Sequence, residues 1–140
     1  MSKPAKTLEF KFERTIPAPP DEVFDAWLNP KIPGNPWNAA DKLILNPKVD
    51  GCFYWTFKST GTPHFGRFTE VARPGRIQHT WMSPNTLGQE STVTLTFEKK
   101  GDGTLMTLIH SGLPDDEKAR SHEKGWGYFL GMFPEQFSKG

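Results

Sequence analysis

Four histidines, His64, His79, His110 and His122, are the side chains of this 140-residue sequence best suited to proton transfer or ligand contact. An unperturbed imidazole has a pKa of about 6.5, so it can give or take a proton near neutral pH. The four lie far apart, and no HxH or HExxH spacing marks a zinc site. The sequence therefore predicts no metal, and nothing in it implies a cofactor.

Other reactive groups give weaker signals. Cys52 is the only cysteine, which excludes an intramolecular disulfide, and no GxSxG motif is present. Asp50 and Glu70 are acid–base candidates by position alone, and carboxylates on strands are usually solvated. An ion pair of Glu70 with Arg67 or Arg14 is the ordinary alternative. We assign no catalytic residue on this basis.

Alternation of apolar and polar residues predicts that most of the chain is antiparallel β-structure. The clearest strands cover residues 8–16 and 92–97, where Leu8, Phe10, Phe12 and Ile16, and then Val93, Leu95 and Phe97, alternate with polar residues. Five more strands are expected, over residues 43–45, 51–57, 64–71, 77–81 and 104–110. Turns that contain glycine or proline separate them, and Gly101-Asp102-Gly103 is typical of a hairpin turn.

A short helix is predicted after the first strand. Pro19 and Pro20 supply helix-compatible φ angles, and Asp21 and Glu22 place negative charge in the first turn. The apolar residues Val23, Phe24, Trp27 and Leu28 then fall on one face. The following segment, residues 31–40, is interpreted as a loop or a broken second short helix.

The C-terminal segment has the period of a longer helix. Trp126, Leu130, Phe133 and Phe137 recur at helical spacing, and His122 extends this stripe by one turn. Three glycines, Gly125, Gly127 and Gly131, are expected to permit close approach to the sheet. Pro134 is expected to kink or end the helix. Since a sheet with one apolar face needs a cover, this helix is expected to lie across it.

Several of these segments resemble the family named after activators of the 90-kDa heat-shock chaperone ATPase (AHSA-like), within the START and polyketide-cyclase-like (SRPBCC) superfamily. The matching residues are Arg14 and Ile16 before 18–27, then Asp50 to Trp55, Gly66 to Val71, Arg76 to Trp81, Gly103 to Gly112, and His122 with Gly125-Trp126. The resemblance implies an α+β helix-grip (START/Bet v-like) fold. A curved antiparallel sheet of six to seven strands would wrap around a long C-terminal helix, with two short helices after the first strand. Residues 1–140 would form one such domain.

Composition limits the classes of partner that we expect for this chain. The formal net charge is +1 without a basic stripe, which argues against nucleic-acid binding. The N-terminus lacks the apolar core of a signal peptide, and no apolar run approaches the roughly 20 residues of a membrane span. We therefore expect a soluble cytoplasmic domain. The edge residues 43–45 are candidates for pairing in a homodimer.

The eleven Phe and five Trp either fill the core or line a pocket. The leading hypothesis is a hydrophobic cavity between sheet and C-terminal helix that binds a small apolar or amphipathic molecule. The candidate ligand-binding residues are Trp55, Phe68, His79, Trp81, Leu95, His110, His122, Trp126 and Phe133. For each of these histidines the alternative is an imidazole hydrogen-bonded inside the core.

Two other functions remain as alternatives. Polyketide-cyclase-like relatives carry out cyclisation, dehydration or hydrolysis in such cavities, and here His79 or His110 would be the general acid or base. The family name implies a third function, regulation of a chaperone ATPase.

Overall fold

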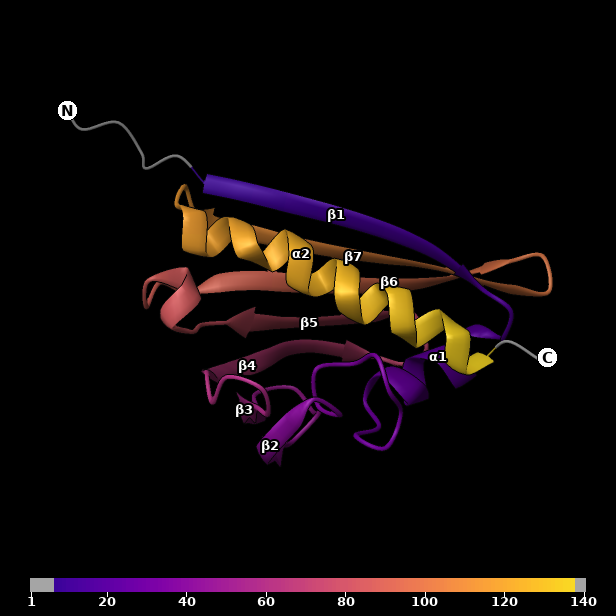
Figure 1. Ribbon diagram of the computed structural model, residues 1–140. Coiled ribbons are helices and arrows are strands. Elements are labelled where there is room, and N and C mark those ends of the chain that lie inside the picture. The colour runs from indigo at the N-terminus through magenta and orange to yellow at the C-terminus, as the bar shows by residue number, and fades with distance from the viewer. Residues whose placement is uncertain (1–6, 138–140) are drawn as a thin grey trace.

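A seven-stranded antiparallel sheet and one long helix make up most of the molecule (Figure 1). The computed structural model describes residues 7–137, so residues 1–6 and 138–140 of the expected domain lie outside the described part. The strands are β1 (Thr7–Ile16), β2 (Ala40–Leu45), β3 (Cys52–Phe57), β4 (Pro63–Ala72), β5 (Arg76–Trp81), β6 (Ser91–Lys100) and β7 (Gly103–Pro114). The helices are α1 (Pro20–Trp27) and α2 (Glu117–Met132), with short 3-10 turns η1 (Pro84–Thr86) and η2 (Phe133–Phe137). The expected α+β fold class is confirmed.

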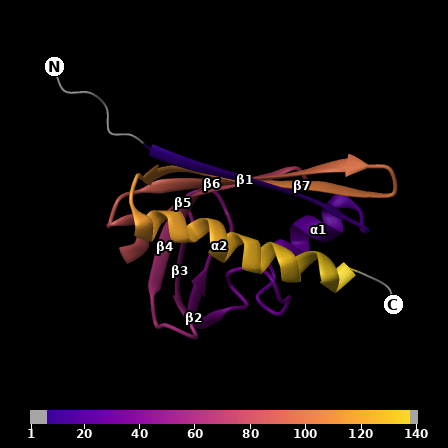
Figure 2. The ribbon, with the colours of Figure 1, turned by 45° about the horizontal axis from the view of Figure 1, so that its top comes forward.

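The strand order is β1-β7-β6-β5-β4-β3-β2. Neighbouring strands are therefore consecutive in sequence, except for the pair β1 and β7. Alternation sets the two faces: Val93, Leu95 and Phe97 of β6 are buried, and threonines lie between them. β2, β3 and β4 bend away from β1, β6 and β7, which gives the sheet the curl seen in Figure 2. α2 lies inside this curl.

Only one short helix, α1, lies between β1 and β2, so the second short helix of the expected fold was wrong and the alternative of a loop was right. Residues 28–39 form turns instead. Pro30, Pro33 and Pro36 remove backbone donors that a helix would need. The Asn35 side chain stabilises the turns, because its Nδ2 donates to the carbonyls of Ala26 at 2.9 Å and Asn29 at 2.8 Å.

The long helix begins at a side-chain cap, since the Asp116 carboxylate accepts the Lys118 N–H at 2.8 Å. It ends at Met132, before Pro134, as expected. The role expected for its glycines is wrong: a Cβ at Gly125, Gly127 or Gly131 would meet nothing within 4 Å. These glycines therefore leave open space beside the helix and do not bring it closer to the sheet.

No helix within residues 7–137 is long and apolar enough to cross a membrane.

Candidate functional site

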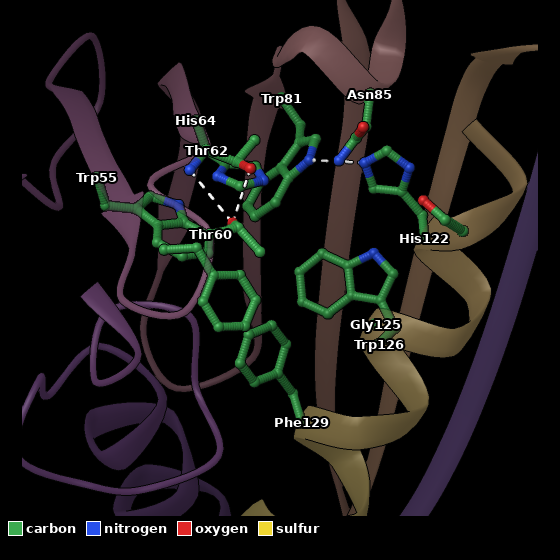
Figure 3. A pocket seen from close by; sticks show the side chains of 12 residues that line it. Trp55, Thr60, Thr62, His64, Trp81, Asn85, His122, Gly125, Trp126 and Phe129 are labelled. Carbon is green, nitrogen blue, oxygen red and sulfur yellow. Dashed lines mark hydrogen bonds between the residues drawn. The ribbon is translucent and has the colours of Figure 1, made fainter. Parts of the chain in front are cut away.

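A cavity of about 210 Å³ separates the β3–β4 hairpin from α2 (Figure 3). The hairpin side is formed by Trp55, Phe57, Thr60, Thr62 and His64. The opposite side is formed by Trp81 of β5, Asn85 of η1, and Ser121, His122, Gly125, Trp126 and Phe129 of α2. The wall is therefore mostly aromatic, and none of its described residues is Asp, Glu, Lys or Arg.

The hairpin wall contains a stacked pair, Trp55 and His64. β3 and β4 place the two residues directly opposite each other, and their rings stack with centroids 4.2 Å apart and an interplanar angle of 11°. Both side chains are buried, yet Trp55 Nε1 and His64 Nδ1 have no hydrogen-bond partner within the described chain. An unsatisfied buried polar group costs about 1–3 kcal/mol, so this wall carries two costly atoms beside empty space.

The imidazole of His64 is held in its neutral form. Burial, together with the nearby His122 and against a smaller opposing effect of the Thr62 backbone, lowers the pKa of His64 to about 4. Near neutral pH, His64 therefore contributes a polar but uncharged ring nitrogen to the cavity.

On the helix wall, both ring nitrogens of His122 are occupied. Its Nε2 accepts the Trp81 Nε1–H at 3.2 Å, which makes Nδ1 the protonated nitrogen that donates to the Ala119 carbonyl at 2.8 Å. Burial lowers the pKa of His122 as well. The residue thus fixes the position of Trp81 and presents the face of its ring, not a free nitrogen, to the cavity.

Behind Trp126, His110 forms a complete hydrogen-bond chain. The Trp126 Nε1–H donates to His110 Nδ1 at 2.9 Å. The Ser91 hydroxyl donates to the Trp81 carbonyl at 2.7 Å, so Ser91 Oγ accepts from His110 Nε2–H at 2.8 Å. Burial lowers the pKa of His110 well below its usual value. With both nitrogens bonded and the ring fully buried, His110 has no site left for a substrate proton.

The structure places the nine predicted site residues in two groups. Trp55, Trp81, His122 and Trp126 line the cavity. The remaining five are buried in the core and do not line it: Phe68, His79, Leu95, His110 and Phe133.

His79 lies in the second group. Its Nδ1–H donates to the Thr80 carbonyl at 2.9 Å, and the rings of Phe53 and Phe68 lie 4.9 and 5.3 Å from its own. Burial lowers the pKa of His79 to about 4. The environment is that of a core side chain.

Three of the rings that line the cavity, Phe57, His64 and Phe129, were not among the predicted site residues. A signal for His64 existed, because alternation from the inward Phe68 through Gly66 places His64 on the same face. The same alternation places Phe57 on the face of Phe53 and Trp55.

The carboxylate candidates lie on the surface, away from the cavity. Asp50 accepts from Arg67 at 3.0 Å, and Glu70 accepts from Arg76 at 2.7 Å. The pairing of Glu70 with Arg67 or Arg14 was therefore wrong. Across residues 7–137, no group of three His, Cys, Asp or Glu side chains is placed to hold a metal ion.

Two further hollows adjoin the cavity. One of about 430 Å³ shares Phe57, Ser121 and Gly125 with it, and one of about 270 Å³ shares Phe57 and Phe129. The rings of Phe57 and Phe129 stack with centroids 6.1 Å apart and so separate the cavity from the second hollow. Phe57 is therefore common to all three spaces.

Comparison with known proteins gives one family and many similar folds. A family model described as "Activator of Hsp90 ATPase homolog 1-like protein" matches residues 17–137. No curated protein matches the chain.

Among solved structures, protein CV1439 from Chromobacterium violaceum is 19% identical, with a TM-score of 0.75 over 94% of this chain and 98% of that one. The HSP90 activator PFC0360w from Plasmodium falciparum is 23% identical, with a TM-score of 0.70 over 88% and 91%. The Aha1 dimer from Colwellia psychrerythraea is 13% identical, with a TM-score of 0.71 over 93% and 96%. At these identities the likeness establishes the fold alone.

Proposed function

The chain belongs to the family of Activator of Hsp90 ATPase homolog 1-like proteins, and we propose that this member binds a small, uncharged, amphipathic molecule in the cavity between the β3–β4 hairpin and α2. The observation that carries the proposal is the pair of buried, unpartnered polar atoms, Trp55 Nε1 and His64 Nδ1, on the cavity wall. A bound molecule that supplies their missing partners removes the cost of leaving them unpaired.

The polar end of the ligand follows from these two atoms. An indole N–H can only donate, so the ligand brings an acceptor to Trp55. The neutral ring nitrogen of His64 accepts or donates according to its tautomer. A hydroxyl or carbonyl group satisfies this pair.

The absence of charged side chains among the described lining residues favours an uncharged ligand. Burying an ion without a partner costs far more than burying a neutral polar group. Both lining histidines have a lowered pKa, so neither supplies a positive charge near neutral pH.

The size of the cavity limits the rest of the ligand. Sites for drug-sized molecules measure about 300–1,000 Å³, whereas a cavity of about 150 Å³ holds benzene. At about 210 Å³ the cavity fits a molecule with a single ring. The surrounding rings of Trp81, Trp126 and Phe129 provide apolar and edge-to-face contacts.

Access runs past Gly125. The outer hollow of about 430 Å³ meets the cavity at Phe57, Ser121 and Gly125, and no atom lies within 4 Å of the position of a Cβ at residue 125. We infer that a ligand enters between the hairpin and this helix glycine.

Acid–base turnover in the same cavity is the second candidate, because His64 brings an unpartnered imidazole nitrogen to it. A pKa of about 4 makes His64 a weak base near neutral pH, since an effective base has a pKa close to the working pH. Binding without turnover is therefore the function we favour. ATPase stimulation of a chaperone remains the third, and a direct ATPase assay tests it.

The test measures phenol and toluene binding by calorimetry, and by NMR of the Trp55 indole N–H. We expect phenol to bind, to shift that indole signal, and to bind more tightly than toluene or benzoate. Trp55→Phe keeps a ring but removes the N–H, so it should weaken phenol binding about tenfold, or roughly 1.4 kcal/mol, without changing toluene binding.

Tyr54→Phe is the matched control, because Tyr54 is on the same strand but outside the cavity lining. It should leave the affinity for phenol unchanged. Failure of both phenol and toluene to perturb the cavity residues would overturn the proposal. Equal phenol affinity in Trp55→Phe and the parent protein would contradict the proposed hydrogen bond between the Trp55 indole N–H and the polar group of the ligand.

A further inference from the structure

The two edge strands of the sheet carry different outward side chains. On β1 the exposed residues alternate along the strand and include Glu9, Lys11 and Glu13. Such charges keep an edge from pairing with another chain. On β2, at the other edge, Ile44 points outward with 64% of its surface exposed.

Ile44 is the end of an apolar row on the outer face. The strand register places Ile44 opposite Tyr54, and Tyr54 opposite Phe65. An isolated bridge joins Phe65 to Met82. Tyr54 and Phe65 are 38% and 41% exposed, so the row is an exposed band that leads to the open edge of the sheet. We call these four residues the outer row.

The backbone of β2 is open on its free side. The Asn46 N–H donates to the Cys52 carbonyl at 3.1 Å, and the Lys42 N–H donates to Thr56 Oγ1 at 3.1 Å. Even-numbered residues therefore direct their N–H groups toward β3. Because successive peptide groups point to opposite sides of a strand, those of Leu43 and Leu45 point away from the sheet.

We propose that β2 pairs antiparallel with β2 of a second copy, about a two-fold axis at Ile44, so that the two sheets become continuous. In this register Leu43 lies opposite the partner's Leu45, and each of the two such pairs exchanges two N–H···O=C bonds. Ile44 meets the partner's Ile44 at a non-hydrogen-bonded position, where Cα atoms approach to about 4.5 Å. The two outer rows then join end to end.

Charge selects this register over its neighbours. Centring the pair on Lys42 would place two ammonium groups opposite each other, which is destabilising. Centring it on Leu43 would place Lys42 against the apolar side chain of the partner's Ile44. Centred on Ile44, Lys42 lies opposite the partner's Asn46. The edge is thus complementary to itself, which identifies a second copy as the occupant, because a two-fold interface places the same surface on both sides.

The first experiment is a concentration series by sedimentation equilibrium on the full chain. The parent protein should dimerise, and Ile44→Lys should raise the dissociation constant of the dimer by about tenfold or more. Val49→Lys is the matched control: Val49 is also an exposed apolar residue, at 54%, but lies in the turn after β2. It should dimerise like the parent.

The second experiment tests the register by disulfide formation in a Cys52→Ser background. Ile44→Cys should form a covalent dimer on mild oxidation, since the expected Cα separation suits a disulfide. Lys42→Cys should not. A parent protein that stays monomeric, a dimer that survives Ile44→Lys, or cross-linking through residue 42 and not residue 44 would each overturn the proposal. None of these outcomes depends on what the cavity binds.

Discussion

Two buried tryptophan–histidine pairs, one between α2 and β7 and one between β3 and β4, differ in their hydrogen bonding. Trp126 and His110 belong to a hydrogen-bond chain that continues through Ser91 to the Trp81 carbonyl. Trp55 and His64 stack face to face, but the indole N–H and one imidazole nitrogen have no partner within the described residues. The residue types and the burial are similar, so neither property separates the two pairs.

The difference shows where a polar side chain serves the fold and where it is available to a ligand. A saturated network holds Trp126 in place and specifies one neutral tautomer of His110. An unsaturated pair beside a cavity reduces stability unless something binds there. Completeness of hydrogen bonding, rather than residue identity, is therefore the useful criterion for the histidines of this protein.

The largest expected effect is acid destabilisation, which arises from the buried histidines of the cavity wall and of the core. His64 and His79 have a pKa of about 4 when folded, against 6.5 when unfolded. Between these pKa values the unfolded chain binds more protons than the folded chain, so the free energy of unfolding falls as the pH decreases from 6.5 toward 4. Above pH 6.5 the contribution of these histidines to stability is fully present. Each such histidine adds up to about 1.4 kcal/mol per pH unit to the slope.

Denaturant unfolding from pH 4.5 to 8 measures this slope. His64→Phe should reduce it by about 1.4 kcal/mol per pH unit, the contribution of one proton. An unchanged slope would mean that His64 is protonated in the folded protein. The conclusion that the cavity wall is uncharged would then be wrong.

Truncation of the saturated histidine should have the next largest effect. His110→Ala leaves the Trp126 indole N–H without its acceptor and opens a cavity, so we expect a loss of roughly 3–5 kcal/mol in unfolding free energy. His64→Phe keeps the stack and removes an unpaired atom, so its stability should stay within about 1 kcal/mol of the parent. Chemical denaturation at pH 7.5 compares the two. Similar losses in both variants would erase the distinction between the pairs.

The smallest expected effect in stability comes from filling the entrance. Gly125→Leu and Gly131→Leu each replace a helix glycine that has open space around it, so each should stabilise α2 by up to about 1 kcal/mol. Only residue 125 lines the cavity. Gly125→Leu should therefore abolish phenol binding in calorimetry, while Gly131→Leu should retain it. Equal binding by both variants would mean that ligands do not pass residue 125.

The strands were predictable because the alternation of apolar and polar residues in each strand reflects its one buried face. Alternation over residues 92–97 matches a strand with one buried face, and the structure extends it to Ser91–Lys100. β7 continues to Pro114, four residues past the predicted end, because Thr7 and Leu8 of β1 pair with Pro114 and Leu113. Local pattern cannot report such a distant partner. Local pattern also left residues 31–40 open between a loop and a second helix, because the side-chain hydrogen bonds of Asn35 that hold the turns reach back to Ala26 and Asn29.

The site was only partly accessible to sequence reasoning. Alternation along the strands places Trp55 and Trp81 on the inward face of the sheet. It cannot tell which inward residues line a cavity, because that depends on how all the side chains fill the space inside the curved sheet. The hydrogen-bond state of each histidine also depends on residues far away in sequence, such as Ser91 for His110. His64 shows the limit most clearly: its face was predictable, and its missing partner was not.

The pairing of β1 with β7 has a consequence for synthesis on the ribosome. Of the strands that the structure describes, Thr7–Ile16 is translated first and its partner, Gly103–Pro114, last. About 100 residues separate them, which corresponds to roughly 5–20 seconds of elongation. During that interval the nascent segment remains unpaired, and its alternating glutamates and lysine discourage association with neighbouring chains on the same polysome. The pairing that completes the sheet is therefore expected only after Gly103–Pro114 has emerged from the exit tunnel.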